Sequence, residues 1–168
     1  MILKYIFTAI ITILALVVQS HTSLDVIRVF GVKPDLLFII VVYFAYAFGA
    51  FYGQVVAFAS GLLRDSVSGS PLGFLTLPSV FIAFIIGMFG KEILKDNLMN
   101  ISLMIFAASF VKGIISFLLS AIFLSADVFA IINIVLPESL YNAIIAPALF
   151  ILLNKLFADD VNRGEPNL

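Results

Sequence analysis

The sequence predicts an all-α integral membrane protein, built as a bundle of about six transmembrane helices. Hydrophobic residues make up 63% of its 168 residues, charged residues only 11%, and the mean hydropathy is +1.23. Soluble domains carry about a quarter charged residues. Charge-free stretches lie at 5–24, 36–63, 66–90, 97–111, 113–126 and 139–154. Several of them exceed the roughly 18 apolar residues that mark a spanning helix.

The first apolar segment is expected to form a retained helix over 2–20. Lys4 followed by an apolar run also fits the outline of a secretory signal peptide. Residues 20–24 contain no small-x-small cleavage site, and no soluble domain follows them. Both observations favour a retained helix.

The charge-free stretch 36–63 is expected to contain two helices. As one helix it would be about 42 Å long, well beyond the roughly 30 Å hydrocarbon core of a bilayer. Gly49 and Gly53 interrupt its middle, and Pro34-Asp35 is typical of a helix start. We therefore expect helices over 34–48 and 50–66, with one long tilted helix as the alternative.

The remaining spans follow from turn residues and charges. A helix over 73–90 is expected to end at Gly90, and a longer one covers 98–124. Residues 125–133 read as an interfacial connection, and Pro137-Glu138 as the start of a last helix that ends at 156. The domain prediction is one transmembrane domain over 1–157 and a polar, disordered cytoplasmic tail over 158–168.

Lys and Arg placement tests the number of spans, because these residues collect in cytoplasmic loops. Six spans with the N-terminus inside, and five with the N-terminus outside, both give a cytoplasmic excess. Charge therefore does not choose between them. Both alternatives place the loop at 91–96 and the C-terminus in the cytoplasm.

Composition excludes several classes of function. The chain has no cysteine, a single histidine (His21) and a net charge of −1. Disulfides, cysteine ligands and paired-histidine metal sites are thereby excluded, and no basic block points to nucleic acid. No catalytic constellation or phosphate-binding glycine loop occurs. We expect a non-enzymatic protein without a cofactor or metal.

Small residues recur at four-residue spacing after the break in the 36–63 stretch. The series is Gly49, Gly53, Ala57, Gly61, Asp65, Gly69 and Gly73. Such ridges let helix backbones approach closely in lipid, so they predict either internal helix packing or docking of a partner helix. Asp65 is expected either to be solvated at the interface or to turn inward, where neighbouring glycines let backbone amides reach its carboxylate.

Two polar residues lie inside later spans. Lys112 is flanked by charge-free stretches, and an ammonium at the bilayer centre costs roughly 2.5–3.5 kcal/mol on insertion scales. Asp65, Asp127 or Glu138 are candidate ion-pair partners, a proton or solute path is a second reading, and snorkelling on a tilted helix is a third. Asn142 is expected to hydrogen-bond between helices.

Sequence motifs between 34 and 153 resemble those of one bacterial family. They are Pro34-Asp35-Leu36-Leu37, then Gly53, then the Gly-x-x-x-Asp-x-x-x-Gly-x-x-x-Gly core from Gly61 to Gly73, and Leu140-Tyr141-Asn142 in the last helix. This combination resembles the family of the rod shape-determining protein MreD. Lys112 is not part of the family's pattern.

The resemblance implies a non-enzymatic, multi-pass subunit of the cell-elongation complex in the bacterial inner membrane. Such a subunit is expected to bind MreC, to act with RodA and a class B penicillin-binding protein in peptidoglycan synthesis, and to serve MreB indirectly.

The family also resembles in fold the substrate-binding subunits of energy-coupling-factor vitamin transporters. That likeness supplies the alternative function, a small-molecule-binding subunit. Against it, Ala9 and Ala15 lack the four-residue spacing of those subunits' docking pattern, and the chain has no Trp. A proton-coupled transporter that uses Lys112 and Asp65 is a third reading.

Overall fold

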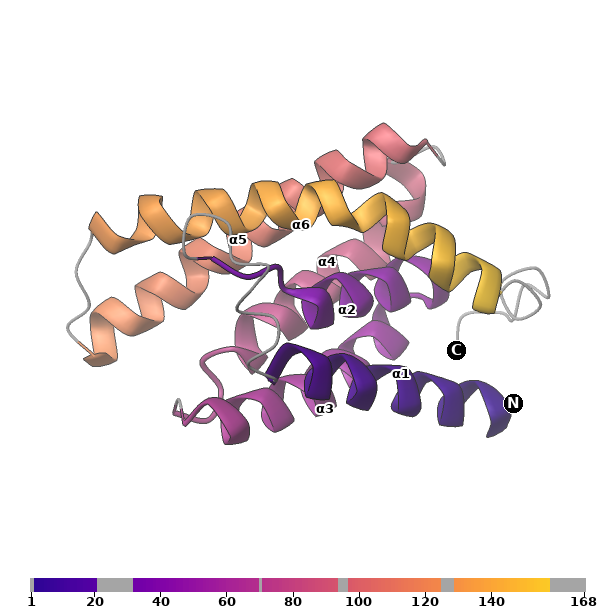
Figure 1. Ribbon diagram of the computed structural model, residues 1–168, viewed down its shortest axis with the longest axis horizontal. Coiled ribbons are helices and arrows are strands. Elements are labelled where there is room, and N and C mark those ends of the chain that lie inside the picture. The colour runs from indigo at the N-terminus through magenta and orange to yellow at the C-terminus, as the bar shows by residue number, and fades with distance from the viewer. Residues whose placement is uncertain (1, 21–31, 70, 94–96, 125–128, 158–168) are drawn as a thin grey trace.

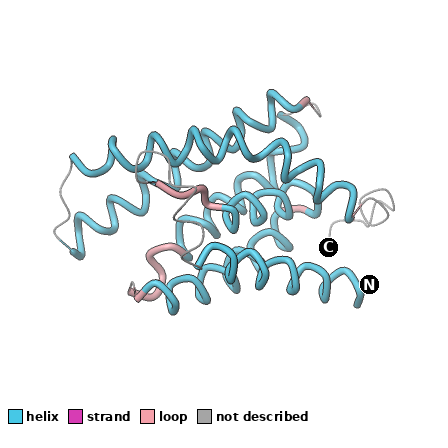
Figure 2. Tube along the Cα trace, viewed as in Figure 1, coloured by secondary structure: helices cyan, strands magenta, loops and turns pink. Residues whose placement is uncertain are grey.

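The computed structural model describes residues 2–20, 32–69, 71–93, 97–124 and 129–157. Within these ranges the chain forms six α-helices, as Figures 1 and 2 show. They are α1 (Ile2–Ser20), α2 (Leu36–Phe48), α3 (Ala50–Ser68), α4 (Thr76–Ile93), α5 (Leu98–Leu124) and α6 (Phe129–Leu156). The expected all-α bundle is therefore present, and the polar tail at 158–168 lies outside the described residues.

Helix α2 forms the centre of the bundle. It packs against each of the other five helices, and residues 37–45 are all buried. A helix that is apolar on every side is expected to be enclosed in this way. At 13 residues it is about 20 Å long, shorter than the roughly 30 Å hydrocarbon core. The surrounding helices shelter its backbone ends, which lipid alone would leave unsatisfied.

Gly49 separates α2 from α3. Its φ of 90° lies in the region that favours glycine, and its amide still donates to the Ala45 carbonyl at 3.0 Å. Beyond the turn, a methyl group added at Gly53 would lie 2.4 Å from the Ala45 Cβ, so the two helices touch at backbone distance. The stretch therefore forms two helices, and the alternative of one long tilted helix is wrong.

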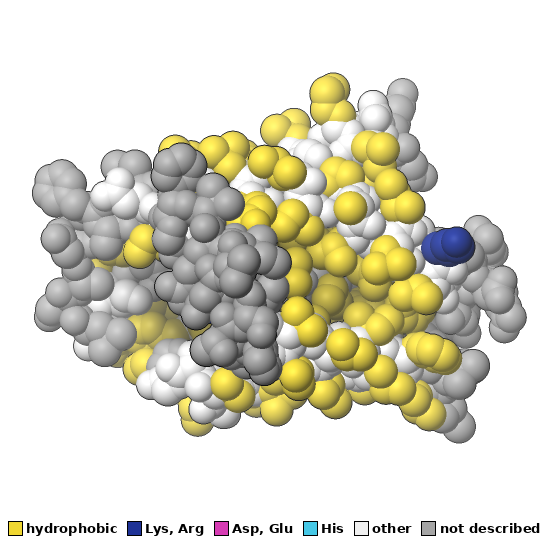
Figure 3. Space-filling view, in the orientation of Figure 1, with side chains coloured by type: hydrophobic (Ala, Val, Ile, Leu, Met, Phe, Trp, Pro, Cys, Tyr) yellow, Lys and Arg dark blue, Asp and Glu magenta, His cyan; other side chains and the backbone are white. Residues whose placement is uncertain are grey.

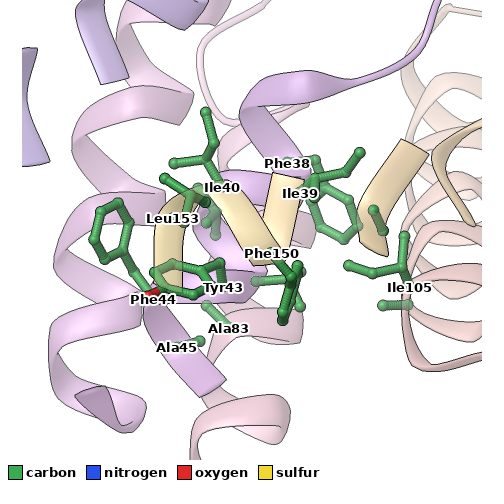
Figure 4. Close-up of a cluster of buried hydrophobic side chains, with 14 of the residues drawn as sticks. Phe38, Ile39, Ile40, Tyr43, Phe44, Ala45, Ala83, Ile105, Phe150 and Leu153 are labelled. Carbon is green, nitrogen blue, oxygen red and sulfur yellow. The ribbon is translucent and has the colours of Figure 1, made fainter. Parts of the chain in front are cut away.

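Aromatic side chains join α2 to the end of α6. The Tyr43 ring lies edge-on to Phe150, with centroids 5.3 Å apart, and Phe44 meets Phe157 at the same distance. Figure 4 shows Phe150 and Leu153 of α6 beside Tyr43, within the cluster of buried side chains. Edge-on geometry suits the charge distribution of aromatic rings. These contacts fix α6 against the central helix.

The bounds of α6 and α4 differ most from the expected ones. Helix α6 begins at Phe129, so Pro137 lies inside the helix and does not start it. Val135, two residues before Pro137, packs on α5, where a methyl group added at Gly113 would lie 2.4 Å from the Val135 Cγ1. Helix α4 begins at Thr76 and continues past Gly90 to Ile93, so Gly90 is not a C-terminal cap.

The surface is apolar on the scale expected of a lipid-facing protein. Phe51, Ile122 and Ile144 are 73%, 73% and 76% exposed, and they lie on three different helices. Figure 3 shows hydrophobic side chains over much of the described part of one face. Among the described residues, Leu98–Phe123 and Asn133–Leu156 are long and apolar enough to cross a bilayer, and three shorter helices are also apolar.

Candidate functional site

The candidate site is built around Asp35, which caps the N-terminus of α2. Its Oδ1 accepts a hydrogen bond from the Phe38 amide at 3.1 Å, and its own amide donates to Asn142 Oδ1 at 2.7 Å. A carboxylate at this position satisfies an otherwise unpaired amide and faces the positive end of the helix dipole. Only 1% of Asp35 is exposed, so the carboxylate needs further partners.

Two cations supply those partners. Arg64 of α3 and Lys112 of α5 both donate to Asp35 Oδ2, and the Lys112 ammonium also donates to Glu138 Oε1 of α6 at 3.1 Å. We call Asp35, Arg64, Lys112 and Glu138 the charge cluster. Its two acids and two bases cancel in formal charge. This pairing compensates the cost of placing charges in a low-dielectric interior.

Burial differs within the charge cluster. The Asp35 and Lys112 side chains are 2% and 5% exposed, whereas those of Arg64 and Glu138 are each 25% exposed. Lys112 Nζ also lies 4.7 Å from the centre of the Phe38 ring, within cation–π range. The cluster therefore has a sealed pair at its centre and a more accessible pair at its edge.

Lys112 lies inside the bundle and pairs with one of the acids considered for it. Glu138 is a partner, Asp65 is not, and Asp127 lies outside the described residues. Sequence reasoning missed Asp35 because Pro34-Asp35 reads as an ordinary solvated helix start and lies 77 residues from Lys112. A signal was available in the apolar sequence after Asp35. A helix start that is buried leaves an acid beside it with few water molecules as hydrogen-bond partners.

Amide side chains link the charge cluster to α1 and add a further contact between α5 and α6. Gln19 of α1 donates to Asp35 Oδ1 and accepts from the Leu37 amide, both at 3.2 Å. Asn142 is 0% exposed, and its amide nitrogen donates to Ser109 Oγ of α5 at 3.1 Å. Buried polar networks with satisfied members specify one packing arrangement. Side chains from α1, α3, α5 and α6 therefore converge on the start of α2.

Asp65 forms a separate site between α3 and α4. Its carboxylate accepts from the amides of Gly73, Leu75 and Thr76 at 2.8, 3.0 and 3.3 Å, and from Thr76 Oγ1 at 2.6 Å. The side chain is fully buried. It satisfies amides at the N-terminus of α4 that have no helical partner. Of the two expected placements, the structure has the inward one.

The glycines of the ridge fall in two groups. Gly53 lies against Ala45 of α2, and a methyl group added at Gly61 would lie 2.7 Å from the Thr76 Cα of α4. Gly69 and Gly73 instead have positive φ, 68° and 104°, in the turn that follows α3. The ridge therefore spans two helix contacts and a turn.

Two close glycine contacts were not singled out from the sequence. A methyl group added at Gly87 of α4 would lie 2.3 Å from the Ala50 Cα of α3, and Gly113 lies against Val135. An isolated glycine within an apolar helix was the signal, because in lipid it often marks close backbone approach.

A cavity of about 490 Å³ lies beside the charge cluster. It opens between α6 on one side and α1 and α3 on the other, which run along opposite sides of the molecule in Figure 1. Its lining residues are Leu16, Gln19, Val32, Lys33, Asp35, Arg64, Val67, Ser68, Ile134 and Glu138. The accessible pair of the charge cluster therefore faces this cavity.

The two most buried carboxylates among the described residues take part in contacts between helices. Within the described ranges, no group of three or more His, Cys, Asp or Glu residues is placed to hold a metal ion. The buried carboxylates of Asp35 and Asp65 are occupied by hydrogen-bond donors from neighbouring helices. The arrangement can hold helices together and present an ion pair to a ligand.

Comparison with known proteins identifies the family. No curated protein and no solved structure matches the chain significantly, so the likeness in fold to energy-coupling-factor subunits stays a prediction. In contrast, the family described as rod shape-determining protein MreD matches residues 1–159. Because this match covers nearly the whole chain, the protein belongs to the family of the rod shape-determining protein MreD, which is a membrane component of the system that determines rod shape.

Proposed function

We propose that this protein binds MreC in the bacterial inner membrane and thereby helps to coordinate peptidoglycan synthesis with cell shape. The observation that carries the proposal is the family match over residues 1–159. The family is a structural, shape-determining one and is not known as an enzyme family. RodA, a class B penicillin-binding protein and, indirectly, MreB complete the proposed set of partners.

The proposed topology has six spans with both termini in the cytoplasm. In Figure 1 the first turns of α1 and the last turns of α6 lie toward the same end of the bundle. That placement supports an even number of crossings, and with it the six-span alternative with the N-terminus inside. Lys155, in the last turn of α6, then lies at the cytoplasmic face, as the distribution of Lys and Arg favours.

We further propose that the ridge residues and Asn142 act on partner binding through the shape of the bundle. Gly53 and Gly61 face α2 and α4, and Asp65 faces the start of α4, so neighbouring helices already occupy these positions. A partner helix would meet the outer surfaces of the helices that these residues hold in place. Asn142 contributes by fixing α6 to the start of α2.

Depletion of the protein in its native bacterium, followed by microscopy, tests the function. The expected result is that rods become round and that MreC loses its localisation, with wild-type complementation restoring both. Normal shape after depletion would overturn the proposal. Normal shape combined with a vitamin requirement would instead support the alternative of a small-molecule-binding transporter subunit.

Co-purification with MreC tests the proposed indirect role of the ridge. Gly61→Leu should weaken recovery of MreC because its side chain collides with Thr76 and displaces α4. Ser66→Leu is the matched control, since it places the same side chain at an exposed position of the same helix. Equal recovery of MreC with both variants, at equal membrane abundance, would contradict the role of the α3–α4 contact.

A further inference from the structure

The cavity beside the charge cluster has the size and the lining of a ligand site. Its volume of about 490 Å³ falls within the roughly 300–1,000 Å³ of small-molecule pockets. Apolar side chains, most of them from α1, α3 and α6, form part of its wall, and charged, amide and hydroxyl side chains form the rest. Such a mixed wall suits an amphipathic ligand with a polar end and an apolar end.

Arg64 and Glu138 retain unused hydrogen-bonding capacity at this cavity. Arg64 bonds Asp35 through Nη1, which leaves other N–H groups of the five on its guanidinium for a ligand. Glu138 accepts from Lys112 through Oε1, and its second oxygen accepts no hydrogen bond from the described residues. Because Lys33 also lines the cavity, the wall offers cationic donors for an anion next to the Glu138 acceptor for a cation.

These two groups select the headgroup chemistry. A guanidinium binds the oxygens of a phosphate, and a carboxylate accepts hydrogen bonds from a primary ammonium. A purely anionic headgroup would bring its charge toward Glu138, and a quaternary ammonium has no N–H to donate. The ligand that satisfies both residues is a zwitterion that joins a phosphate to a primary ammonium.

The rim of the cavity indicates that the zwitterion belongs to a lipid. Val67 and Ile134 line the cavity and are 61% and 51% exposed. Apolar side chains at the mouth would contact acyl chains that leave toward the bilayer. A soluble zwitterion would gain nothing from this surface.

We propose that the cavity binds the headgroup of phosphatidylethanolamine, with its phosphate on Arg64 and its ammonium on Glu138. The bound lipid would lie between α6 and the α1–α3 pair and would link the two sides of the bundle. This inference concerns lipid binding alone, so it stands or falls independently of MreC binding.

Native mass spectrometry of the full chain tests the proposal. The protein is released from membranes that contain equal amounts of phosphatidylethanolamine and phosphatidylcholine with matched acyl chains. The expected result is about a tenfold preference for phosphatidylethanolamine, the size of one charge-assisted hydrogen bond. On the wild-type chain the preference should fall as the amine is methylated stepwise. Equal retention of both lipids would overturn the proposal.

Two variants test whether the preference for phosphatidylethanolamine arises at the cavity. Glu138→Gln should reduce the preference to about one, whereas Lys155→Gln, which neutralises a charge away from the cavity, should keep it. Loss of the preference in both variants would overturn the assignment to Glu138. Soluble O-phosphoethanolamine distinguishes the two sources of the headgroup: displacement of the lipid at millimolar concentration would show a site for a soluble zwitterion and would overturn the lipid assignment.

Discussion

Replacing Lys112 with Met removes the cation that joins α5 to both α2 and α6. Asp35 then keeps only Arg64 as a charged partner, and Glu138 loses its cation. Breaking a buried ion pair by removing one member costs about 3–5 kcal/mol, because the remaining charge is left uncompensated. Since Glu138 is a quarter exposed, we expect the lower end of that range, about 3 kcal/mol.

A second substitution tests whether the cost arises from charge. In Lys112→Met combined with Glu138→Gln, the unpaired carboxylate is gone and Asp35 with Arg64 forms a neutral pair. We expect the double variant to regain about 2 kcal/mol of the loss, within the usual coupling of contacting residues. A double variant that is no more stable than Lys112→Met would refute the pairing of Lys112 with Glu138.

The assay is equilibrium unfolding of the purified chain in mixed micelles. One probe is helix content, and the second, independent probe is the signal of the aromatic side chains, which include no tryptophan. Lys155→Met is the matched control, because Lys155 is exposed in the last turn of α6. Its stability should stay within about 0.5 kcal/mol of the wild type, as surface substitutions usually do. If Lys112→Met behaved in the same way, the ammonium would lie in water or at the headgroups, and the argument for a buried charge cluster would fail.

Three further variants test other contacts by the same unfolding measurement. Asp65→Asn should cost about 1.5–3 kcal/mol, because hydrogen bonds to a charged acceptor at the start of α4 are lost; an unchanged stability would show that water replaces them. Gly113→Ala should cost about 1–3 kcal/mol through collision with Val135, and Val135→Ala in the same chain should relieve part of the loss. Gly87→Ala should cost at least as much with no such relief, since its methyl group meets the backbone at Ala50; a smaller loss than that of Gly113→Ala would contradict this difference.

The helices were predictable from the sequence because their signals are local. Charge-free stretches and the break at Gly49 indicate six helices without any knowledge of their neighbours. The start of α6 was not predictable in this way. Pro137 with an acid after it is typical of a helix N-terminus, whereas the helix begins at Phe129 and its residue Val135 packs on α5, a contact that no local pattern indicates.

The candidate site was predictable only in part, because it joins distant residues. Lys112 stood out as a charge in an apolar helix, and Asp65 as an acid among glycines, so both were named. Their partners depend on how helices pack, which no local pattern records. Asp35 therefore went unrecognised as the shared acceptor of Arg64 and Lys112, although its position before α2 was correctly read as a helix start.

The enclosure of α2 has a consequence for how the chain is assembled during translation. A 13-residue segment is too short to cross a bilayer as an independent stage of insertion, so α2 must enter together with α3 as a hairpin closed at Gly49. Asp35 lies at the N-terminal end of α2, and its cationic partners are synthesised after it, first Arg64 on α3 and then Lys112 on α5. The helix at the centre of the finished protein therefore reaches its final environment only after α5 and α6 have left the ribosome.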